Sequence, residues 1–181
     1  WEYSLDFKAE DYILREDVIE LVFEGLDTYA DVWMNGKKIL HADNMFRTYS
    51  YDVKDIIKET NNIKIKFYPF DKERDSLIET YPLRFPEKYA VMRKAAYQNG
   101  WDWAPRYMNM GIWQPVYLKA WTRSTICSAS VITNEINDDK ADLFFEACVN
   151  ADVEHDITLQ LCQENEKILE KNIDLKVGES Y

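Results

Sequence analysis

Hydrophobic and polar residues alternate along much of the first third of the chain. Tyr3, Leu5 and Phe7 are separated by the polar residues Ser4 and Asp6. A period of two residues is typical of a β-strand that buries one face. Further β-rich runs occupy residues 18–23, 29–34, 37–40, 48–53 and 62–68. The pattern predicts antiparallel β-structure, with a short helical turn over 52–59.

An Asn-Gly pair separates two of these runs. Asn35 and Gly36 lie between the segments 29–34 and 37–40. Both residue types tolerate a positive φ, which the tight turn of a two-residue β-hairpin requires. We therefore expect the two segments to pair as a hairpin.

The alternation disappears between residues 71 and 105. Charged residues mix there with six aromatic residues, and prolines at positions 82, 86 and 105 interrupt any long helix. The charged segment 71–75 predicts a solvated turn or the start of a helix, and 87–96 has room for a short helix. A stretch of this length without a sheet role is usually a functional loop.

Strand character returns over 112–121, and the polar residues 122–125 are typical of a hinge. Four more β-rich runs follow, at 126–133, 141–149, 155–162 and 167–175. Short strands at this spacing predict an immunoglobulin-like sandwich, which has roughly seven strands in its complete form. We therefore expect a first domain over 1–122 and an incomplete immunoglobulin-like domain over 123–181.

Composition and charge narrow the class of partner. The chain has 181 residues, 46% of them hydrophobic and 14% aromatic, and a net charge of −11. An acidic surface repels phosphates and anionic headgroups, so neither nucleic acid nor a membrane is expected as a partner. The excess of Trp and Tyr points instead to a sugar or a protein.

Several reactive or aromatic residues have an ordinary structural interpretation. The cysteines at positions 127, 148 and 162 fit no metal-ligand spacing and are predicted to be small core residues. Trp33, Trp113 and Trp121 lie in strand patterns and are predicted to be core residues. His41 and His155 are expected at the surface or at strand edges, without partner ligands. No cofactor and no metal is expected.

The densest group of functional candidates lies between residues 93 and 106. Trp101 and Trp103 flank a single carboxylate, Asp102, after a glycine that permits a sharp bend. An indole packs on the C–H face of a pyranose, and a carboxylate accepts hydrogen bonds from two hydroxyls. The alternative is a loop that its aromatic residues tie down, with Asp102 capping a turn. The residues alone leave both interpretations open.

The segment 99–105 resembles the G-W-D-W-G-P motif of β-mannosidases in the glycoside hydrolase family 2 superfamily. It departs from that motif at Asn99 and at Ala104, where the family more often has another residue and glycine. Three other segments resemble motifs of these enzymes and occur in the same order as there. Residues 23–36 resemble an F-x-G-L-D-T hairpin, residues 44–47 an N-M-F-R element, and residues 110–118 a G-I-W-x-P-V run. The resemblance extends over about residues 1–121.

The resemblance implies a jelly-roll, galactose-binding-like sandwich, followed by an immunoglobulin-like sandwich and a TIM barrel with two catalytic glutamates. The chain ends before such a barrel, and Glu135 and Glu166 fall in predicted turns, so the fragment is expected to be inactive alone. The first domain is also expected to lack N-terminal strands and to expose a sheet edge.

The resemblance further implies roles for the residues of the loop. Asp102 would hydrogen-bond the hydroxyls of a terminal β-mannoside, and Trp101 would help to wall the subsite at the mouth of the barrel. The remaining residues would support the shape of the loop: Trp103, Tyr97, Arg93 and Asn99. Two alternatives stay open. One is a sister enzyme of family 2 (a β-galactosidase, β-glucuronidase or exo-β-glucosaminidase), and the other is a free-standing carbohydrate-binding module.

Overall fold

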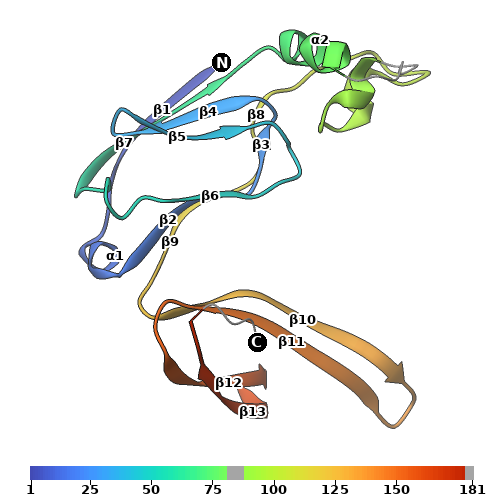
Figure 1. The fold of residues 1–181 in the computed structure, drawn as a ribbon. Helices are drawn as coiled ribbons and strands as arrows, with labels where there is room; N and C mark the ends of the chain where they lie inside the picture. The colour runs from blue at the N-terminus through green and yellow to red at the C-terminus, as the bar shows by residue number, and fades with distance from the viewer. Residues whose placement is uncertain (81–87, 178–181) are drawn as a thin grey trace. The chain divides into compact units, whose positions relative to one another are not determined.

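The computed structural model describes residues 1–80 and 88–177. They fall into two compact units, Trp1–Ala120 and Trp121–Tyr181 (Figure 1). The first unit carries two main sheets, several short helices and the long loop, and the second consists of four strands.

The first unit contains a four-stranded and a three-stranded sheet. The four-stranded sheet has the order β1-β7-β4-β5, with every neighbouring pair antiparallel: β1 (Glu2–Lys8), β7 (Thr60–Phe67), β4 (Ala30–Met34) and β5 (Lys37–Ala42). The three-stranded sheet has the order β6-β2-β9: β6 (Tyr49–Asp52), β2 (Val18–Phe23) and β9 (Val116–Trp121). Two short strands, β3 (Leu26–Asp27) and β8 (Gly111–Ile112), pair with each other.

A single hydrophobic core joins the two main sheets into a β-sandwich. Ile19, Leu21 and Phe23 of β2 are buried against Val32 of β4 and Ile65 of β7. These residues occupy alternate positions of their strands, as a half-buried strand requires. The structure thus confirms the all-β class. The alternation over β1 marks a strand, but the predicted burial of one face is wrong: Tyr3 and Leu5 of this edge strand are 44% and 62% exposed, and only Phe7 is partly buried against the core.

The predicted hairpin is present between β4 and β5. Asn35 and Gly36 have φ values of 51° and 82°, and Met34 pairs with Lys37 across the turn. Asn35 also fastens the turn to the neighbouring segment, because its side-chain amide donates to the Ile56 carbonyl at 2.8 Å. Residues 53–57 form a turn, with the Ile57 amide bonded to the Val53 carbonyl at 2.8 Å.

Helical structure differs most from the prediction. The charged segment 71–75 is the start of an 11-residue helix, α2 (Phe70–Thr80), which confirms the second of its two predicted alternatives, although the length of the helix was not predicted. An ion pair between Arg74 and Asp71, at 2.7 Å, supports its first turns. A short helix α1 (Asp11–Arg15) was not predicted. The helix expected over 87–96 is two 3₁₀ turns, η1 (Lys88–Val91) and η2 (Ala96–Asn99), and its first residue lies outside the described part of the chain.

The second unit contains two antiparallel hairpins. They pair β10 (Ser124–Ile136) with β11 (Ala141–Ala151), and β12 (His155–Gln163) with β13 (Glu166–Leu175). Val149, Ala151 and Leu175 form its small buried cluster. All four predicted strands are present. Glu135, however, lies in β10 and not in a turn, and Glu166 is the first residue of β13.

Two predictions about individual side chains are wrong. Cys127 and Cys162 are exposed and Cys148 is only partly buried, because these strands leave much of both faces uncovered in the described unit. Trp113 is half exposed and lies between β8 and β9, where Pro115 interrupts the strand; Trp33 and Trp121 are partly buried.

The prediction for the histidines agrees with the structure, since His41 is exposed on the edge strand β5 and His155 is the first residue of β12. Each ring also has a hydrogen-bond partner. His41 Nδ1 donates to Asp31 at 2.7 Å, and His155 Nε2 lies 3.0 Å from the Ser124 hydroxyl. Within residues 1–80 and 88–177, no helix has the length and apolar character needed to cross a membrane.

Candidate functional site

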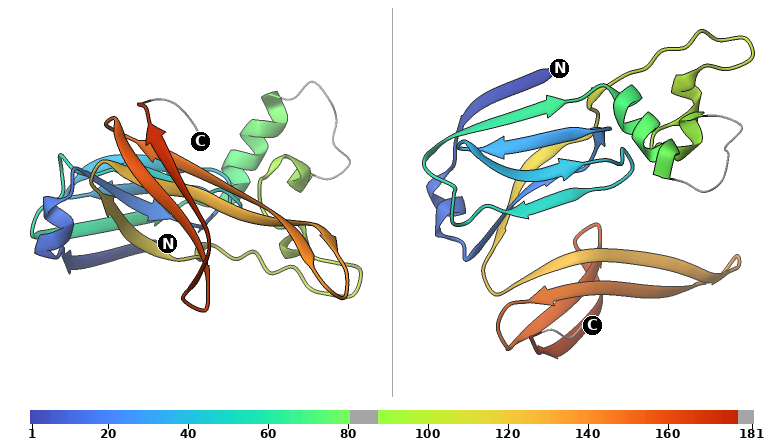
Figure 2. Two further views of the ribbon diagram at one scale, coloured as in Figure 1. Left: turned by 90° about the horizontal axis from the view of Figure 1, so that it is seen from below. Right: turned by 45° about the horizontal axis from the view of Figure 1, so that its top comes forward.

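The long loop between α2 and β8 carries the residues that the sequence singled out. Both views of Figure 2 show α2 and this loop beside one end of the sheets. The loop reverses at residues 101–104, where the amide of Trp101 bonds to the carbonyl of Ala104 at 3.3 Å and the amide of Ala104 returns a bond at 3.2 Å. Gly100 precedes the turn with a φ of 103°, which residues with a side chain rarely adopt. The glycine and the two bonds therefore define a tight tip.

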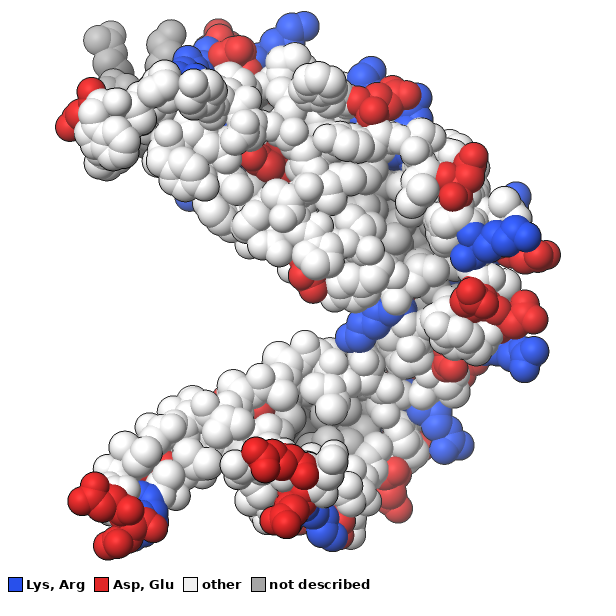
Figure 3. Space-filling view, turned by 180° about the vertical axis from the view of Figure 1, so that it is seen from behind, with Lys and Arg blue, Asp and Glu red and all other residues white. Residues whose placement is uncertain are grey.

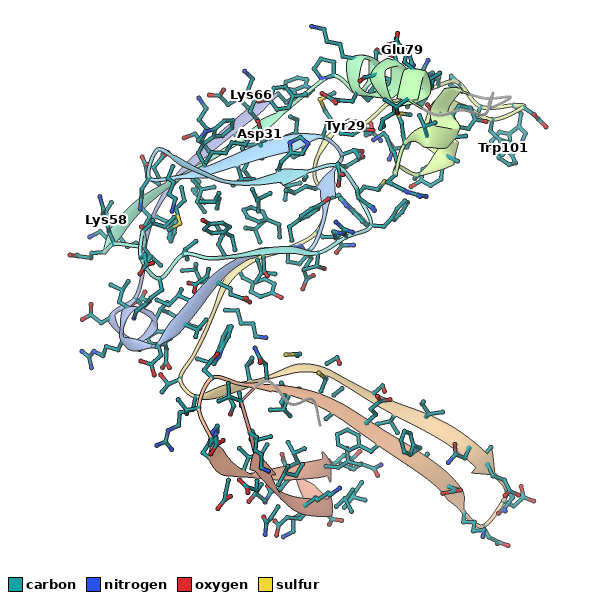
Figure 4. The ribbon with its side chains drawn as sticks, viewed as in Figure 1. Tyr29, Asp31, Lys58, Lys66, Glu79 and Trp101 are labelled. Atoms are coloured by element: carbon teal, nitrogen blue, oxygen red, sulfur yellow. The ribbon has the colours of Figure 1, made fainter. Side chains whose placement is uncertain are left out.

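An open pocket of about 570 Å³ lies within this loop. It is lined by Tyr97, Gln98, Trp101, Trp103, Ala104, Pro105, Tyr107 and Asn109. Trp101 is 64% exposed and Trp103 85% exposed, and Figure 4 shows Trp101 at the outer end of the loop. Flat aromatic faces with a few amide groups suit the C–H faces and hydroxyls of a sugar ring.

The predicted site residues divide into three groups. Trp101, Trp103 and Tyr97 line the pocket, and all three are exposed. Asp102 lies at the tip between the two indoles, exposed and outside the pocket lining. The supporting roles of Tyr97 and Trp103 and the sugar contact of Asp102 stay predictions.

Arg93 and Asn99 lie in the part of the loop that precedes the tip. Asn99 ends η2 and is partly buried. The side chain of Arg93 is exposed, but its carbonyl accepts the Met45 amide at 2.9 Å, which joins the loop to the segment after β5. Arg93 thus supports the loop through its backbone.

The strongest attachment of the loop is a buried polar cluster that the sequence analysis missed. Lys94 Nζ donates to Asp27 Oδ1 at 2.5 Å, and Gln98 Nε2 donates to Asp27 Oδ2 at 3.2 Å. The Thr28 hydroxyl also donates to Asp27. The only sequence signal was Lys94 itself, a cation between Met92 and two alanines in a segment otherwise interpreted as an exposed loop.

Burial and pairing act on Lys94 in opposite directions. Its side chain is 2% exposed and that of Asp27 is 5% exposed. Loss of hydration lowers the pKa of Lys94, and the hydrogen bond and charge of Asp27 partly offset that effect. A buried ion is stable only when it is paired and hydrogen-bonded, so each partner depends on the other.

A second set of contacts connects the loop to the three other segments that resemble β-mannosidase motifs, 23–36, 44–47 and 110–118. Met45 Sδ accepts the amide of Ala95 at 3.0 Å, and the Met45 carbonyl accepts Trp113 Nε1 at 3.0 Å. Trp113 in turn packs on Gly25, whose carbonyl accepts the Trp113 amide at 3.2 Å. Direct contacts therefore connect the segments around residues 25, 45, 95 and 113 to one another.

One face of the first unit carries few charged side chains. In Figure 3 the body that carries residues 1–120 presents a broad uncharged surface, with acidic and basic side chains mainly along its margins. Large exposed apolar residues of this unit include Trp101, Trp103, Tyr107, Trp113 and Tyr117. Within the described ranges, no group of three or more His, Cys, Asp or Glu residues could hold a metal ion.

The chain is similar to β-mannosidases in sequence and in structure. It is 32% identical to the β-mannosidase of Mus musculus over 133 residues, which are 67% of this chain and 15% of that protein. The crystal structure of the β-D-mannosidase of Dictyoglomus thermophilum matches 99% of this chain and 23% of its own, with a TM-score of 0.79 and 27% identity. The exo-chitosanase of Amycolatopsis orientalis matches 100% of this chain and 20% of its own, with a TM-score of 0.73 and 25% identity.

The chain thus spans about 15% of the length of its curated relatives and about a fifth of the solved structures. The model of a protein family, the glycosyl hydrolase 2 galactose-binding domain-like proteins, matches residues 1–114. This match covers more than half of the chain, and the chain therefore belongs to the galactose-binding-like domains of glycoside hydrolase family 2.

Proposed function

We propose that this chain is a non-catalytic domain of a retaining, exo-acting β-mannosidase and that its aromatic loop borders the subsite for a terminal β-D-mannose. The observation that carries the proposal is the exposed turn Trp101–Asp102–Trp103 beside an open pocket lined by aromatic residues. The β-mannosidases among its relatives support the choice of sugar.

In this proposal two residues of the tip, Trp101 and Asp102, contact the sugar. Trp101 offers an indole face to the sugar ring, while Asp102 accepts hydrogen bonds from two of its hydroxyls. Retaining hydrolysis requires two carboxyl groups held about 5–5.5 Å apart, and we assign these to a TIM barrel that lies outside this chain. A loop that closes one side of the pocket favours removal of terminal sugars, because longer chains cannot pass through.

The test is the hydrolysis of 4-nitrophenyl β-D-mannoside by the full-length protein and by its Asp102→Ala variant. Loss of a charged hydrogen-bonding partner costs about 1.5–3 kcal/mol, so we expect kcat/KM to fall at least about tenfold. Asp55→Ala, which removes an exposed carboxylate from the turn after β6, is the matched control and should leave kcat/KM unchanged. An active wild type that tolerates Asp102→Ala would remove Asp102 from the sugar subsite.

A sister enzyme of family 2 is distinguished in the same assay. The similarity to an exo-chitosanase supports this second candidate. Faster hydrolysis of 4-nitrophenyl β-D-glucosaminide than of the mannoside would replace the mannosidase assignment with that of an exo-β-glucosaminidase.

A third candidate, a carbohydrate-binding module, is favoured by one observation. Among the described residues, those that line the pocket all lie between Tyr97 and Asn109, so this chain supplies them without another domain. Calorimetric titration of the 181-residue chain with mannose and mannobiose tests it. Binding by the chain alone would favour the module, whereas binding only by the full-length protein would favour a shared subsite.

A further inference from the structure

Four residues from three separate segments close a ring of hydrogen bonds at the base of the loop. Asp27 Oδ1 binds Lys94 Nζ at 2.5 Å, and Nζ also donates to the Asn109 carbonyl at 2.6 Å. The Asn109 amide donates to Gln98 Oε1 at 3.2 Å, and Gln98 Nε2 returns to Asp27 Oδ2 at 3.2 Å. We call these four residues, Asp27, Lys94, Gln98 and Asn109, the clasp.

The clasp joins the two arms of the loop to the sheet framework. Lys94 and Gln98 belong to the arm that precedes the tip, and Asn109 belongs to the arm that follows it. Asp27 is the last residue of β3, where it pairs with Gly111 of β8. The clasp therefore holds together the two ends of residues 99–108, the segment that includes Trp101 and Trp103.

Because most of the clasp is buried, breaking any of its hydrogen bonds costs free energy. The side chains of Asp27 and Lys94 are almost fully enclosed, and Gln98 is also buried. Among the described residues no buried side-chain nitrogen or oxygen lacks a partner, so the clasp is fully satisfied. In such a low-dielectric setting the loss of one member leaves another polar group unpaired. An apolar contact would hold the arms together but would not fix their register.

The clasp also reaches the pocket directly. Gln98 and Asn109 are members of the clasp and, at the same time, line the pocket beside the two indoles. A shift of the clasp would therefore move two pocket walls together with the tip that they support.

We propose that Asp27, Lys94 and Gln98 are positioning residues that hold the aromatic tip in the geometry for sugar binding, an inference that rests on the proposed function of the loop. Asp27 and Lys94 act through the loop and do not line the pocket, whereas Gln98 belongs both to the clasp and to the pocket wall. The ion pair between Asp27 and Lys94 fixes the base of the loop. Gln98 is bonded to Asp27 and lines the pocket, so the pocket wall is held in a fixed position relative to that ion pair.

The test compares Lys94→Met, Asp27→Asn and the double variant in the full-length protein. The first readout is hydrogen exchange of the peptides that cover residues 95–110, with peptides from β2 and β7 as internal references. The second is the pair of constants kcat and KM, measured with the same nitrophenyl mannoside, and the third is the melting temperature. We expect Lys94→Met to speed exchange in 95–110 about tenfold or more while the reference peptides keep their rates.

We also expect Lys94→Met to lower kcat/KM by up to about a hundredfold, mainly through KM, because a displacement of about 1 Å has this effect. The double variant removes the unpaired charge, so its melting temperature should recover. Its exchange in 95–110 and its KM should not recover, because the bond from Lys94 Nζ to the Asn109 carbonyl is still missing.

Two results would overturn the proposal: recovery of all three readouts in the double variant, or the same loss of kcat/KM in Asp31→Asn, an equally charged control on β4. If Lys94→Met does not fold, Gln98→Met removes two bonds of the clasp without leaving a buried charge and should raise exchange and KM in the same direction. Local loss of exchange protection in a protein that hydrolyses no mannoside would support the clasp and reject the proposed function.

Discussion

Trp113 packs directly on the backbone of Gly25, with its indole Nε1 held by the Met45 carbonyl at 3.0 Å. A β-carbon at position 25 would lie 2.7 Å from Trp113 Cε2 and 2.7 Å from Gln114 Cγ. The glycine is therefore required by the close approach of an aromatic ring, and it connects β2 and β3 to the segment that leads into β9.

Gly25→Ala should destabilise the first unit because the indole cannot move away without losing its bond to Met45. Overpacking of this kind costs about 1–3 kcal/mol. Urea denaturation of the wild type and the variant measures the free energy of unfolding. The same substitution in a Trp113→Ala background should cost clearly less, because the atoms that it meets are gone. An equal cost in both backgrounds would show that the clash is not the cause.

Asp31 should contribute stability that disappears in acid. Burial acts to raise its pKa, but hydrogen bonds from Lys38, His41 and Tyr68, at 2.7, 2.7 and 2.9 Å, outweigh burial and lower the pKa. The contribution is thus complete above the unfolded pKa of about 3.9 and is lost as the pH falls through the lower folded pKa.

Asp31→Asn should therefore cost about 1.5–3 kcal/mol at pH 7, the usual value of hydrogen bonds to a charged group. The difference in unfolding free energy between wild type and variant should shrink below about pH 4. Asp55→Asn, on the exposed turn after β6, is the control and should show no such convergence. A difference that stays constant between pH 7 and pH 3 would contradict the role of the charge.

The strands of the first unit were predictable because residues close together in the sequence determine them. The strand character of β1 and the Asn35-Gly36 turn each depend on neighbouring residues, and both are confirmed, although the predicted burial of one face of β1 is not. The clasp was not predictable, since Asp27 and Lys94 are 67 positions apart and no periodicity connects them. Their identity as partners depends on the path of the loop.

The errors in helices and cysteines have a similar physical origin. No residue of α2 is buried, so this helix shows no apolar stripe from which a sequence could predict it. Its support comes from pairs such as Arg74 with Asp71. Cys127 lies in a hairpin with strand periodicity, but that pattern predicts burial only where a second layer covers one face.

Asn35 should matter more than an ordinary turn residue. Its side chain donates to the Ile56 carbonyl at 2.8 Å and to Asn61 Oδ1 at 2.9 Å, and it accepts the Asn62 amide at 2.9 Å. Asn35→Ala removes all three bonds and leaves an alanine at a φ of 51°. We expect a loss of about 4–5 kcal/mol, since each of the three bonds contributes about 1 kcal/mol and the conformation costs about 1–2 kcal/mol.

Asn35→Gly separates the two causes of that loss. Glycine accepts the positive φ, so this variant should lose only the contribution of the hydrogen bonds. Thermal unfolding of both variants gives the comparison. An Asn35→Gly variant as unstable as Asn35→Ala would show that backbone strain contributes nothing at this turn.

Trp101 and Trp103 should be dispensable for folding and important for sugar binding. Both indoles are largely exposed, so their removal takes little apolar area out of a core, and surface substitutions usually change stability by less than about 0.5 kcal/mol. If Trp101 faces a sugar ring as proposed, Trp101→Ala should raise the KM of the full-length enzyme for the nitrophenyl mannoside about tenfold, the equivalent of about 1.4 kcal/mol. Trp1→Ala removes an indole that is 79% exposed at the start of β1 and provides the matched control. Equal KM values in Trp101→Ala and Trp1→Ala, with unchanged melting temperatures, would show that the tip lies outside the sugar subsite.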